Sequence, residues 1–324
     1  MMNNTARAHT NIALIKYWGK KDADLRLPLM SSISMTLDAF YTDTNLVLDT
    51  EDKRFYLNGE LVTGKASERV ISYVERLQKL FHVSGNFHVI SQNHVPTSAG
   101  LASSSSAFAA LAASFVKAYQ LDISKKGLSI LARLGSGSAT RSIFGGFAIW
   151  HQGQNSATSF GEAIDETPEM DLRMIAVELN TKQKKISSTQ GMEMAKTSPF
   201  FIPWIHENEA QIIDMKAAIE NNDFTSLGEL AEQNASQMHA VNLACETPFT
   251  YFEPETVALI HLVQDLRKQG LECYYTIDAG PNVKILTELR NSKEIQKAVK
   301  QLLPTVKIVE SGFGPGIQYL NEQI

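Results

Sequence analysis

The segment that most constrains this chain is residues 96–108, which read PTSAGLASSSSAF and lead into an alanine-rich helix expected from about Ser104. Small residues let backbone N–H groups approach a polyanion, hydroxyl groups add donors, and the helix N-terminus adds partial positive charge. The spacing is not the Walker pattern GxxxxGK[ST], so a P-loop fold is not implied. The alternative is a tight turn whose serines cap a closely packed helix. The segment therefore predicts either a phosphate loop or a capped helix.

Composition narrows the class of protein. The 324 residues are 44% hydrophobic and 20% charged, which is typical of a globular protein with room for two domains. A net charge of −5 without a long basic run gives no indication of nucleic-acid binding. Two cysteines, Cys245 and Cys273, lack metal-ligand spacing and favour reduced thiols. Without a signal region or a long apolar run, we expect a cytoplasmic protein that does not bind a membrane.

The order of the expected elements predicts an α+β fold. In the first half, short β-rich segments follow RAHTNIALIK (residues 7–16), and Asn58-Gly59 is expected to form a hairpin turn. The second half is helix-rich between Pro199 and Ala244, and a further helix opens at Pro254 and stops at Gly270. Strands and one more helix follow in a β–α–β order. We place the domain boundary near residue 185, which divides the chain into residues 1–185 and 186–324.

Two polar segments of the first half carry basic side chains. GSGSATR (residues 135–141) bends the chain and places Arg141 where its guanidinium can reach a phosphate with two hydrogen bonds. NIALIKYWGKKD (residues 11–22) sets Lys16, Lys20 and Lys21 around two aromatic residues, directly after an expected core strand. The alternatives are a helix end with a solvated arginine and a strand end with solvated lysines. Both segments are candidates for anion binding.

A candidate general base lies in TIDAGPNVKIL (residues 276–286). Asp278 ends an apolar strand before Ala-Gly-Pro, a position that suits a general base; the alternative is an Asx-turn. In KKISSTQGM (residues 184–192), capping of a helix by Ser187 or Ser188 is favoured over phosphate binding. His239 is expected to be a packing histidine. The sequence has no HExxH-type cluster, so a zinc site is not predicted. Any Mg²⁺ would arrive with nucleotide phosphates.

Taken together and in order, these segments resemble the motifs of the GHMP small-molecule kinase superfamily, and within it the diphosphomevalonate decarboxylase branch. The resemblance extends over nearly the whole chain, because SSTQGM, MHAVNLACETPFTY and YTIDAGPNVKIL continue it through the C-terminal half. It implies a two-domain GHMP kinase fold of the α+β class. A ribosomal-S5-like N-terminal domain and a ferredoxin-like C-terminal domain would enclose the active site in the cleft between them.

The reaction that the resemblance implies belongs to isoprenoid biosynthesis by the mevalonate pathway. ATP phosphorylates the tertiary 3-hydroxyl of mevalonate 5-diphosphate, and loss of that phosphate with CO₂ gives isopentenyl diphosphate and ADP. By resemblance, the catalytic residues are Asp278, Arg141 and Lys20. Other residues are assigned in the same way: Tyr17, Lys20, Arg69, Ser136, Ser138 and Arg141 to substrate; Gly100, Ala102, Ser103, Ser104 and Ser105 to ATP; and Asn11, Lys16 and Ser188 as further candidates.

The resemblance also carries expectations about ligands and assembly. Mg²⁺ is expected with ATP near Ser104 and Ser105, without a metal site built by the protein alone, and a homodimer is expected. Thr189 stands where some bacterial relatives carry an arginine, which leaves one diphosphate contact open. The alternatives are a phosphomevalonate decarboxylase, a GHMP enzyme that only phosphorylates, and an inactive metabolite sensor. A sensor should have lost its general base or its loop hydroxyls, whereas this chain retains Asp278 and the serines.

Overall fold

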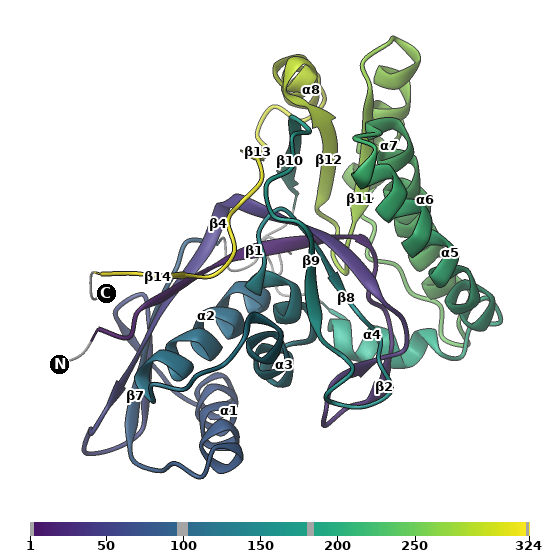
Figure 1. Ribbon diagram of the computed structural model, residues 1–324. Helices are drawn as coiled ribbons and strands as arrows, with labels where there is room; N and C mark the ends of the chain where they lie inside the picture. Colours follow the sequence, from purple (N-terminus) through teal and green to yellow (C-terminus); the bar gives the residue numbers. More distant parts are fainter. Residues whose placement is uncertain (1–2, 96–102, 180–184, 322–323) are drawn as a thin grey trace.

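The computed structural model describes residues 3–95, 103–179, 185–321 and 324, which form two β-sheets with helices packed on them (Figure 1). The first sheet has eight strands and the second has four. Both helices and sheets contribute throughout, so the α+β class predicted from the sequence is confirmed. In Figure 1 the second sheet stands above one end of the first, with α5, α6 and α7 along one side of it.

The first sheet contains most of the strands from the N-terminal half. Strand β1, which pairs with β4 and β14, is almost wholly buried, because helices contact it on both faces of the sheet. Asn58 and Gly59 both have positive φ, at 53° and 85°, which confirms the predicted hairpin turn between β5 and β6. The strands are β1 Ala6–Ile15, β4 Ser32–Leu48, β5 Arg54–Leu57, β6 Glu60–Val62, β7 Phe87–Asn93, β8 Phe147–Trp150, β9 Gly161–Asp165 and β14 Gln318–Tyr319; β2 Lys20–Asp22 and β3 Leu27–Pro28 form a separate hairpin.

The alanine-rich helix α2 packs directly on this sheet. Its alanines include four that are fully buried, at residues 109, 110, 112 and 113, and such small side chains allow close contact with β1 and β4. Gly135 brings α3 against α2, because a Cβ at this position would lie 2.2 Å from the ring of Phe108. The helices of this part are α1 Lys65–Leu80, α2 Ser103–Ala118, α3 Lys125–Gly135 and the 3-10 helix η1 Gly137–Ile143.

The second sheet is antiparallel throughout, in the order β11-β12-β10-β13. Helix α7 begins at Pro254 and ends just before Gly270, whose φ of 90° suits glycine, so the predicted limits of this helix are confirmed. The elements are β10 Leu172–Glu178, β11 Cys273–Ile277, β12 Val283–Glu288 and β13 Lys307–Ser311, with α4 Ser188–Ala195, α5 Phe201–Glu220, α6 Phe224–Leu243, α7 Pro254–Lys268 and α8 Leu289–Leu302.

The two sheets pack on a common core, and their strands do not follow the predicted division of the chain. Strand β10 precedes residue 186 yet pairs with β12 and β13, and β14 returns near the C-terminus to pair with β1. One apolar cluster includes Leu14 of the first sheet, Leu286 of the second and Leu227 of α6. The sheets are therefore joined by continuous packing, and the division of the chain into residues 1–185 and 186–324 stays a prediction.

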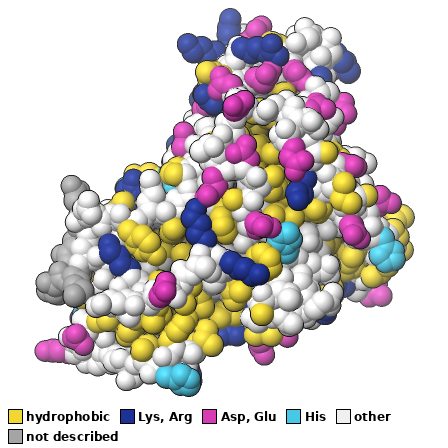
Figure 2. All heavy atoms as spheres, viewed as in Figure 1, with side chains coloured by type: hydrophobic (Ala, Val, Ile, Leu, Met, Phe, Trp, Pro, Cys, Tyr) yellow, Lys and Arg dark blue, Asp and Glu magenta, His cyan; other side chains and the backbone are white. Residues whose placement is uncertain are grey.

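The surface and the helices bear on possible partners. On the face shown in Figure 2, acidic and basic side chains are interspersed and do not form a patch of one sign. Among the described residues, no helix is both long and apolar enough to span a membrane.

Candidate active site

The centre of the site is the carboxylate of Asp278, which lies between two lysine side chains. Lys16 directly follows β1, and its Nζ is 2.7 Å from Oδ1 of Asp278. Lys284 lies in β12, and its Nζ is 3.1 Å from Oδ2. The lysine side chains are 2% and 1% exposed, whereas the Asp278 side chain is 25% exposed. The structure therefore holds a carboxylate that solvent or a ligand can reach, supported from behind by two buried ammonium groups.

Opposing effects determine the charge of Asp278. Burial alone would raise the pKa of this carboxyl group, but the ammonium groups of Lys16 and Lys284 outweigh it and hold the pKa well below its usual value. Burial also lowers the pKa of Lys16, against the attraction of Asp278. At neutral pH Asp278 is consequently an anion. Its side chain accepts a hydrogen bond from Lys16 and forms an ion pair with Lys284. The Gly280 N–H in the turn donates to the backbone carbonyl of Asp278 at 2.8 Å, so the Asx-turn interpretation is not what the structure shows.

Arg141 is held beside this carboxylate by uncharged groups. Its Nε donates to Oδ1 of Asn11 at 3.2 Å, and its Nη1 donates to Oγ of Ser32. Asn11 donates in turn to the carbonyl oxygen of Ser138 at 2.9 Å. Burial lowers the pKa of Arg141 to about 10, although the negative charge of Asp278 opposes the shift. The guanidinium thus remains charged at neutral pH, and its charge is available to an anion bound near Asp278.

Hydroxyl groups from two segments meet at the start of α2. The helix begins at Ser103, and Oγ of Ser104 lies 3.3 Å from Oγ of Ser136, which lies 3.4 Å from Oγ of Ser138. Ser105 is fully buried. This brings the predicted phosphate loop and the GSGSATR segment together, as an anion site at a helix N-terminus requires. The predicted ATP-loop residues Gly100 and Ala102 lie outside the described residues.

Tyr17 and Lys20 lie on the same side of the site. The Tyr17 ring packs on Trp150 with centroids 4.7 Å apart, and its buried hydroxyl has no hydrogen-bond partner among the described residues. Burial raises the pKa of Tyr17, so the hydroxyl keeps its proton and can donate a hydrogen bond to a ligand. Lys20 Nζ contacts Oγ1 of Thr189 at 3.1 Å, which places position 189 of α4 against the basic side chains. It is Lys16, and not Lys20, that contacts Asp278.

Two arginines complete a group of cations that have no carboxylate partner among the described residues. Arg69 donates from Nη2 to the carbonyl oxygen of Gly135 at 3.1 Å, and Arg26 donates from Nε to that of Leu134 at 2.9 Å. Burial lowers the pKa of Lys20 and of Arg26, and neighbouring cations lower them further. Mutually repelling charges without counter-charges are typical of a site that binds a polyanion.

The serine pair at the start of α4 and His239 make contacts that stabilise the fold. Ser187, and not Ser188, caps α4, because its Oγ accepts from the Gln190 N–H at 3.2 Å. Ser188 is half-buried in the first turn of the helix. His239 packs against Phe252 with ring centroids 4.4 Å apart and bonds the Ile277 carbonyl through Nε2 at 3.2 Å. His239 is thus packed as predicted, but its buried Nδ1 has no hydrogen-bond partner among the described residues.

Comparison with known proteins gives the family. Residues 8–161 match the family model of the diphosphomevalonate decarboxylase-like N-terminal domain, and residues 174–321 match that of the mevalonate 5-diphosphate decarboxylase C-terminal domain. The chain belongs to the diphosphomevalonate decarboxylase family. A diphosphomevalonate decarboxylase from Ganoderma lucidum is 36% identical, over 96% of this chain and 84% of its own.

Solved structures of the family have the same fold. The mevalonate diphosphate decarboxylase of Staphylococcus aureus is 43% identical over 98% of both chains, with a TM-score of 0.93. MDDEF in complex with MVAPP, AMPPCP and magnesium is 42% identical over 98% of both chains, with a TM-score of 0.92. The predicted two-domain fold is confirmed by these structures. One similar protein has a different name: a phosphomevalonate decarboxylase of Haloferax volcanii, 31% identical over 92% of both chains.

Sequence reasoning missed two of the residues that this decarboxylase-family site contains. Lys284 interrupts the apolar strand segment NVKIL, and a lysine within a buried strand is a signal for a buried partner. Arg26 lies in a polar loop, where an arginine is ordinarily solvated, so nothing local distinguishes it. Its position depends on the β2–β3 hairpin, which places it against the end of α3.

Proposed function

We propose that this chain catalyses the ATP-dependent decarboxylation of mevalonate 5-diphosphate to isopentenyl diphosphate, with release of ADP, phosphate and CO₂. The observation that carries the proposal is the anionic carboxylate of Asp278, held by Lys16 and Lys284 beside the charged guanidinium of Arg141. Membership of the diphosphomevalonate decarboxylase family supports the reaction. Magnesium would accompany ATP.

The chemistry gives each of these groups a task. A tertiary hydroxyl is a poor leaving group, and phosphorylation makes it a good one. In our proposal the Asp278 carboxylate orients the 3-hydroxyl for attack on the γ-phosphate of ATP. When phosphate leaves C3, positive charge develops at that carbon. The bond between C2 and the substrate carboxylate then breaks, and its electrons form the double bond between C2 and C3 as CO₂ departs. Arg141 would hold that carboxylate near Asp278 until it leaves as CO₂.

The remaining residues would bind the two phosphate chains. We assign the diphosphate of the substrate to the Tyr17 hydroxyl, Lys20, Arg69, Ser136 and Ser138. Support comes from the buried Tyr17 hydroxyl without a partner and from cations that lack carboxylate partners among the described residues. We assign the ATP phosphates to the start of α2, where Ser103, Ser104 and Ser105 lie at a helix N-terminus. Asn11 and Ser188 would act indirectly, through Arg141 and the first turn of α4.

A second candidate is the decarboxylation of 5-phosphomevalonate. It is favoured by the Haloferax volcanii relative and by the uncharged Thr189 beside Lys20. The two candidates are separated by supplying purified protein and Mg·ATP with either compound and identifying the product by mass spectrometry. We expect isopentenyl diphosphate from the diphosphate, with kcat/KM at least about tenfold above that for the monophosphate, since one charge-assisted contact contributes about 1.5–3 kcal/mol. Preference for the monophosphate would overturn the first assignment.

The proposal extends to the whole protein as a cytoplasmic homodimer with domains 1–185 and 186–324. Light scattering after size-exclusion chromatography tests the assembly, because a homodimer has twice the 35.9 kDa of one chain. Limited proteolysis tests the boundary: cleavage near residue 185 into two fragments supports it, and cleavage elsewhere moves it.

A further inference from the structure

Lys284 occupies an unusual place for a charged side chain. It lies within β12, paired with Thr276 of β11 and Ala176 of β10, and is only 1% exposed. Burial of an ammonium group is costly unless the charge is paired and hydrogen-bonded. Its Nζ finds both kinds of partner, Oδ2 of Asp278 at 3.1 Å and the carbonyl oxygen of Asn282 at 3.3 Å. The side chain is therefore aimed at Asp278 by the sheet itself.

The two lysines reach Asp278 from different parts of the fold. Lys16 comes from the end of β1 in the first sheet, and its backbone N–H is held by Oδ1 of Asn234 in α6 at 2.7 Å. Lys284 comes from the strand that pairs with β11, whose end carries Asp278. Its contact with Asp278 consequently does not depend on how the two sheets lie relative to each other. Lys16 occupies Oδ1 and Lys284 occupies Oδ2, so the plane of the carboxylate is fixed.

We propose that Lys284 is a positioning residue for this reaction, and that it keeps Asp278 an oriented anion whether or not Lys16 is in contact. The charged and titratable groups that face Asp278 are Lys16 from β1, Lys284 from β12, Arg141 from η1 and His239 from α6. The last of these is neutral at pH 7, because burial lowers its pKa to about 4. Three cations around one carboxylate make Asp278 a weak proton acceptor that attracts and orients the substrate hydroxyl. This inference rests on the proposed function.

Replacement of Lys284 by methionine removes the charge at similar length. We expect K284M to lower kcat at pH 7 by about tenfold while KM for mevalonate 5-diphosphate changes less than about threefold, as loss of orientation and not of binding predicts. Removal of a cation raises the pKa of the carboxylate, so the acid limb of kcat/KM should move to higher pH by at least about one unit. K284R, which keeps the charge, should leave the acid limb in place.

A matched control is K307M in β13. Lys307 belongs to the same sheet, pairs with Glu178 and is 61% exposed. Its replacement should leave kcat and the acid limb as in the unchanged chain. A purely structural role of Lys284 would lower the melting temperature of K284M without moving the acid limb, and that result would overturn the proposal.

A measurement on the unchanged chain tests the inference even if K284M does not fold. The ¹³C resonance of the Asp278 carboxyl, assigned by its absence from D278N, is followed as the pH is lowered from 7 to 4. We expect no titration in this range, since an unperturbed Asp has a pKa of about 3.9 and would already be nearly half protonated at pH 4. Titration at or above pH 4 would overturn the inference. If no isopentenyl diphosphate forms but the Asp278 resonance titrates at higher pH in K284M than in K307M, the proposed function falls and the role of Lys284 in the ionisation of Asp278 stands.

Discussion

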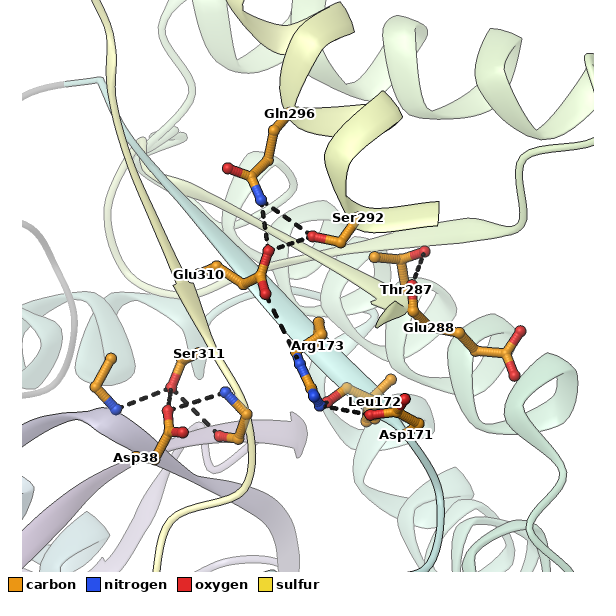
Figure 3. A network of polar contacts seen from close by, with 12 residues as sticks. Asp38, Asp171, Leu172, Arg173, Thr287, Glu288, Ser292, Gln296, Glu310 and Ser311 are labelled. Carbon is orange, nitrogen blue, oxygen red and sulfur yellow. Dashed lines mark hydrogen bonds and ion pairs between the residues drawn. The ribbon is translucent and has the colours of Figure 1, made fainter. Parts of the chain in front are cut away.

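Two polar networks join the same pair of sheets, and they differ in burial. The inner network is Lys16, Asp278 and Lys284, with both lysines almost fully buried. The outer network, drawn in Figure 3, contains Arg173 of β10, which pairs with Asp171 at 2.9 Å and with Glu310 at 3.7 Å. There the Arg173 side chain is 24% exposed and that of Asp171 is 59% exposed.

Part of the outer network fastens the two sheets to each other. Asp38, in β4, accepts hydrogen bonds from Oγ of Ser311 at 2.7 Å and from the Gly312 N–H at 2.9 Å (Figure 3). Each such hydrogen bond contributes about 1 kcal/mol, and solvent screens the exposed ion pair of Arg173 with Asp171. The inner network is different, since buried charges are costly to assemble and are concentrated at functional sites. Burial of the charged side chains, and not the number of ion pairs, therefore distinguishes the candidate active site from the network that stabilises the fold.

The largest expected effect comes from the centre of the inner network. D278N keeps the shape of the side chain but leaves two buried ammonium groups without a counter-charge. We expect kcat to fall by about 10³-fold, because the variant loses the anion that orients the 3-hydroxyl for attack. The control is D171N in the outer network, for which kcat should change less than about twofold. A comparable loss in both variants would contradict the distinction.

Arg141 should follow in size. R141Q keeps hydrogen-bonding capacity toward Asn11 and Ser32 but removes the positive charge. We expect kcat/KM to fall by about 10²-fold, because a charge-assisted contact to an anion contributes about 1.5–3 kcal/mol. The matched substitution R173Q should leave kcat/KM nearly unchanged. Steady-state kinetics on both variants measures this difference. A loss of kcat/KM in R173Q as large as that in R141Q would contradict a special role of Arg141.

Burial of His239, which lies next to the inner network, predicts that the free energy of unfolding depends on pH. Burial lowers its folded-state pKa to about 4, so below the unfolded value of about 6.5 the unfolded chain binds a proton that the folded chain does not. Stability is therefore lost as the pH falls from about 6.5 toward 4, by about 2 kcal/mol at pH 5 from this group. Urea unfolding at pH 7 and pH 5 should show a loss smaller by that amount in H239F. An identical loss in both proteins would refute the assignment.

The smallest effect is expected in the outer network. R173Q removes the pairing with Asp171 and Glu310, and the free energy of unfolding should fall by no more than about 1 kcal/mol. High salt should reduce the difference from the unchanged chain, because it screens exposed charges. A loss of 3 kcal/mol or more in urea unfolding would show that this network is as important to the fold as a buried one.

The sequence predicts those features of the fold that depend on residues close together in the chain. The turn at Asn58-Gly59 and the limits of α7 follow from residues whose backbone preferences act at their own positions. Asp278 and Arg141 are assigned through the resemblance of several ordered segments to one family, because their own segments also fit an Asx-turn and a helix end. The local sequence does not determine which lysine contacts Asp278, since Lys16 and Lys20 are equally basic and four residues apart. In the structure Lys16 directly follows β1, and this position brings its Nζ to Asp278.

Contacts between distant segments could not be predicted. Lys284 meets Asp278 because β11 and β12 pair in one register, with Thr276 opposite Lys284. The pairing of β10 in the second sheet, and the return of β14 to β1, likewise depend on which partner strand is available in the folded chain. A local pattern specifies a strand but not its neighbour, so the second lysine of the site required the structure.

The most direct test of the account counts two products in one reaction. Purified protein is incubated with Mg·ATP and mevalonate 5-diphosphate labelled at the carboxyl carbon, and ADP and CO₂ are measured together. We expect equal amounts of both products, and loss of both in D278N but not in D171N. ADP without CO₂ would contradict it and leave an enzyme that only phosphorylates.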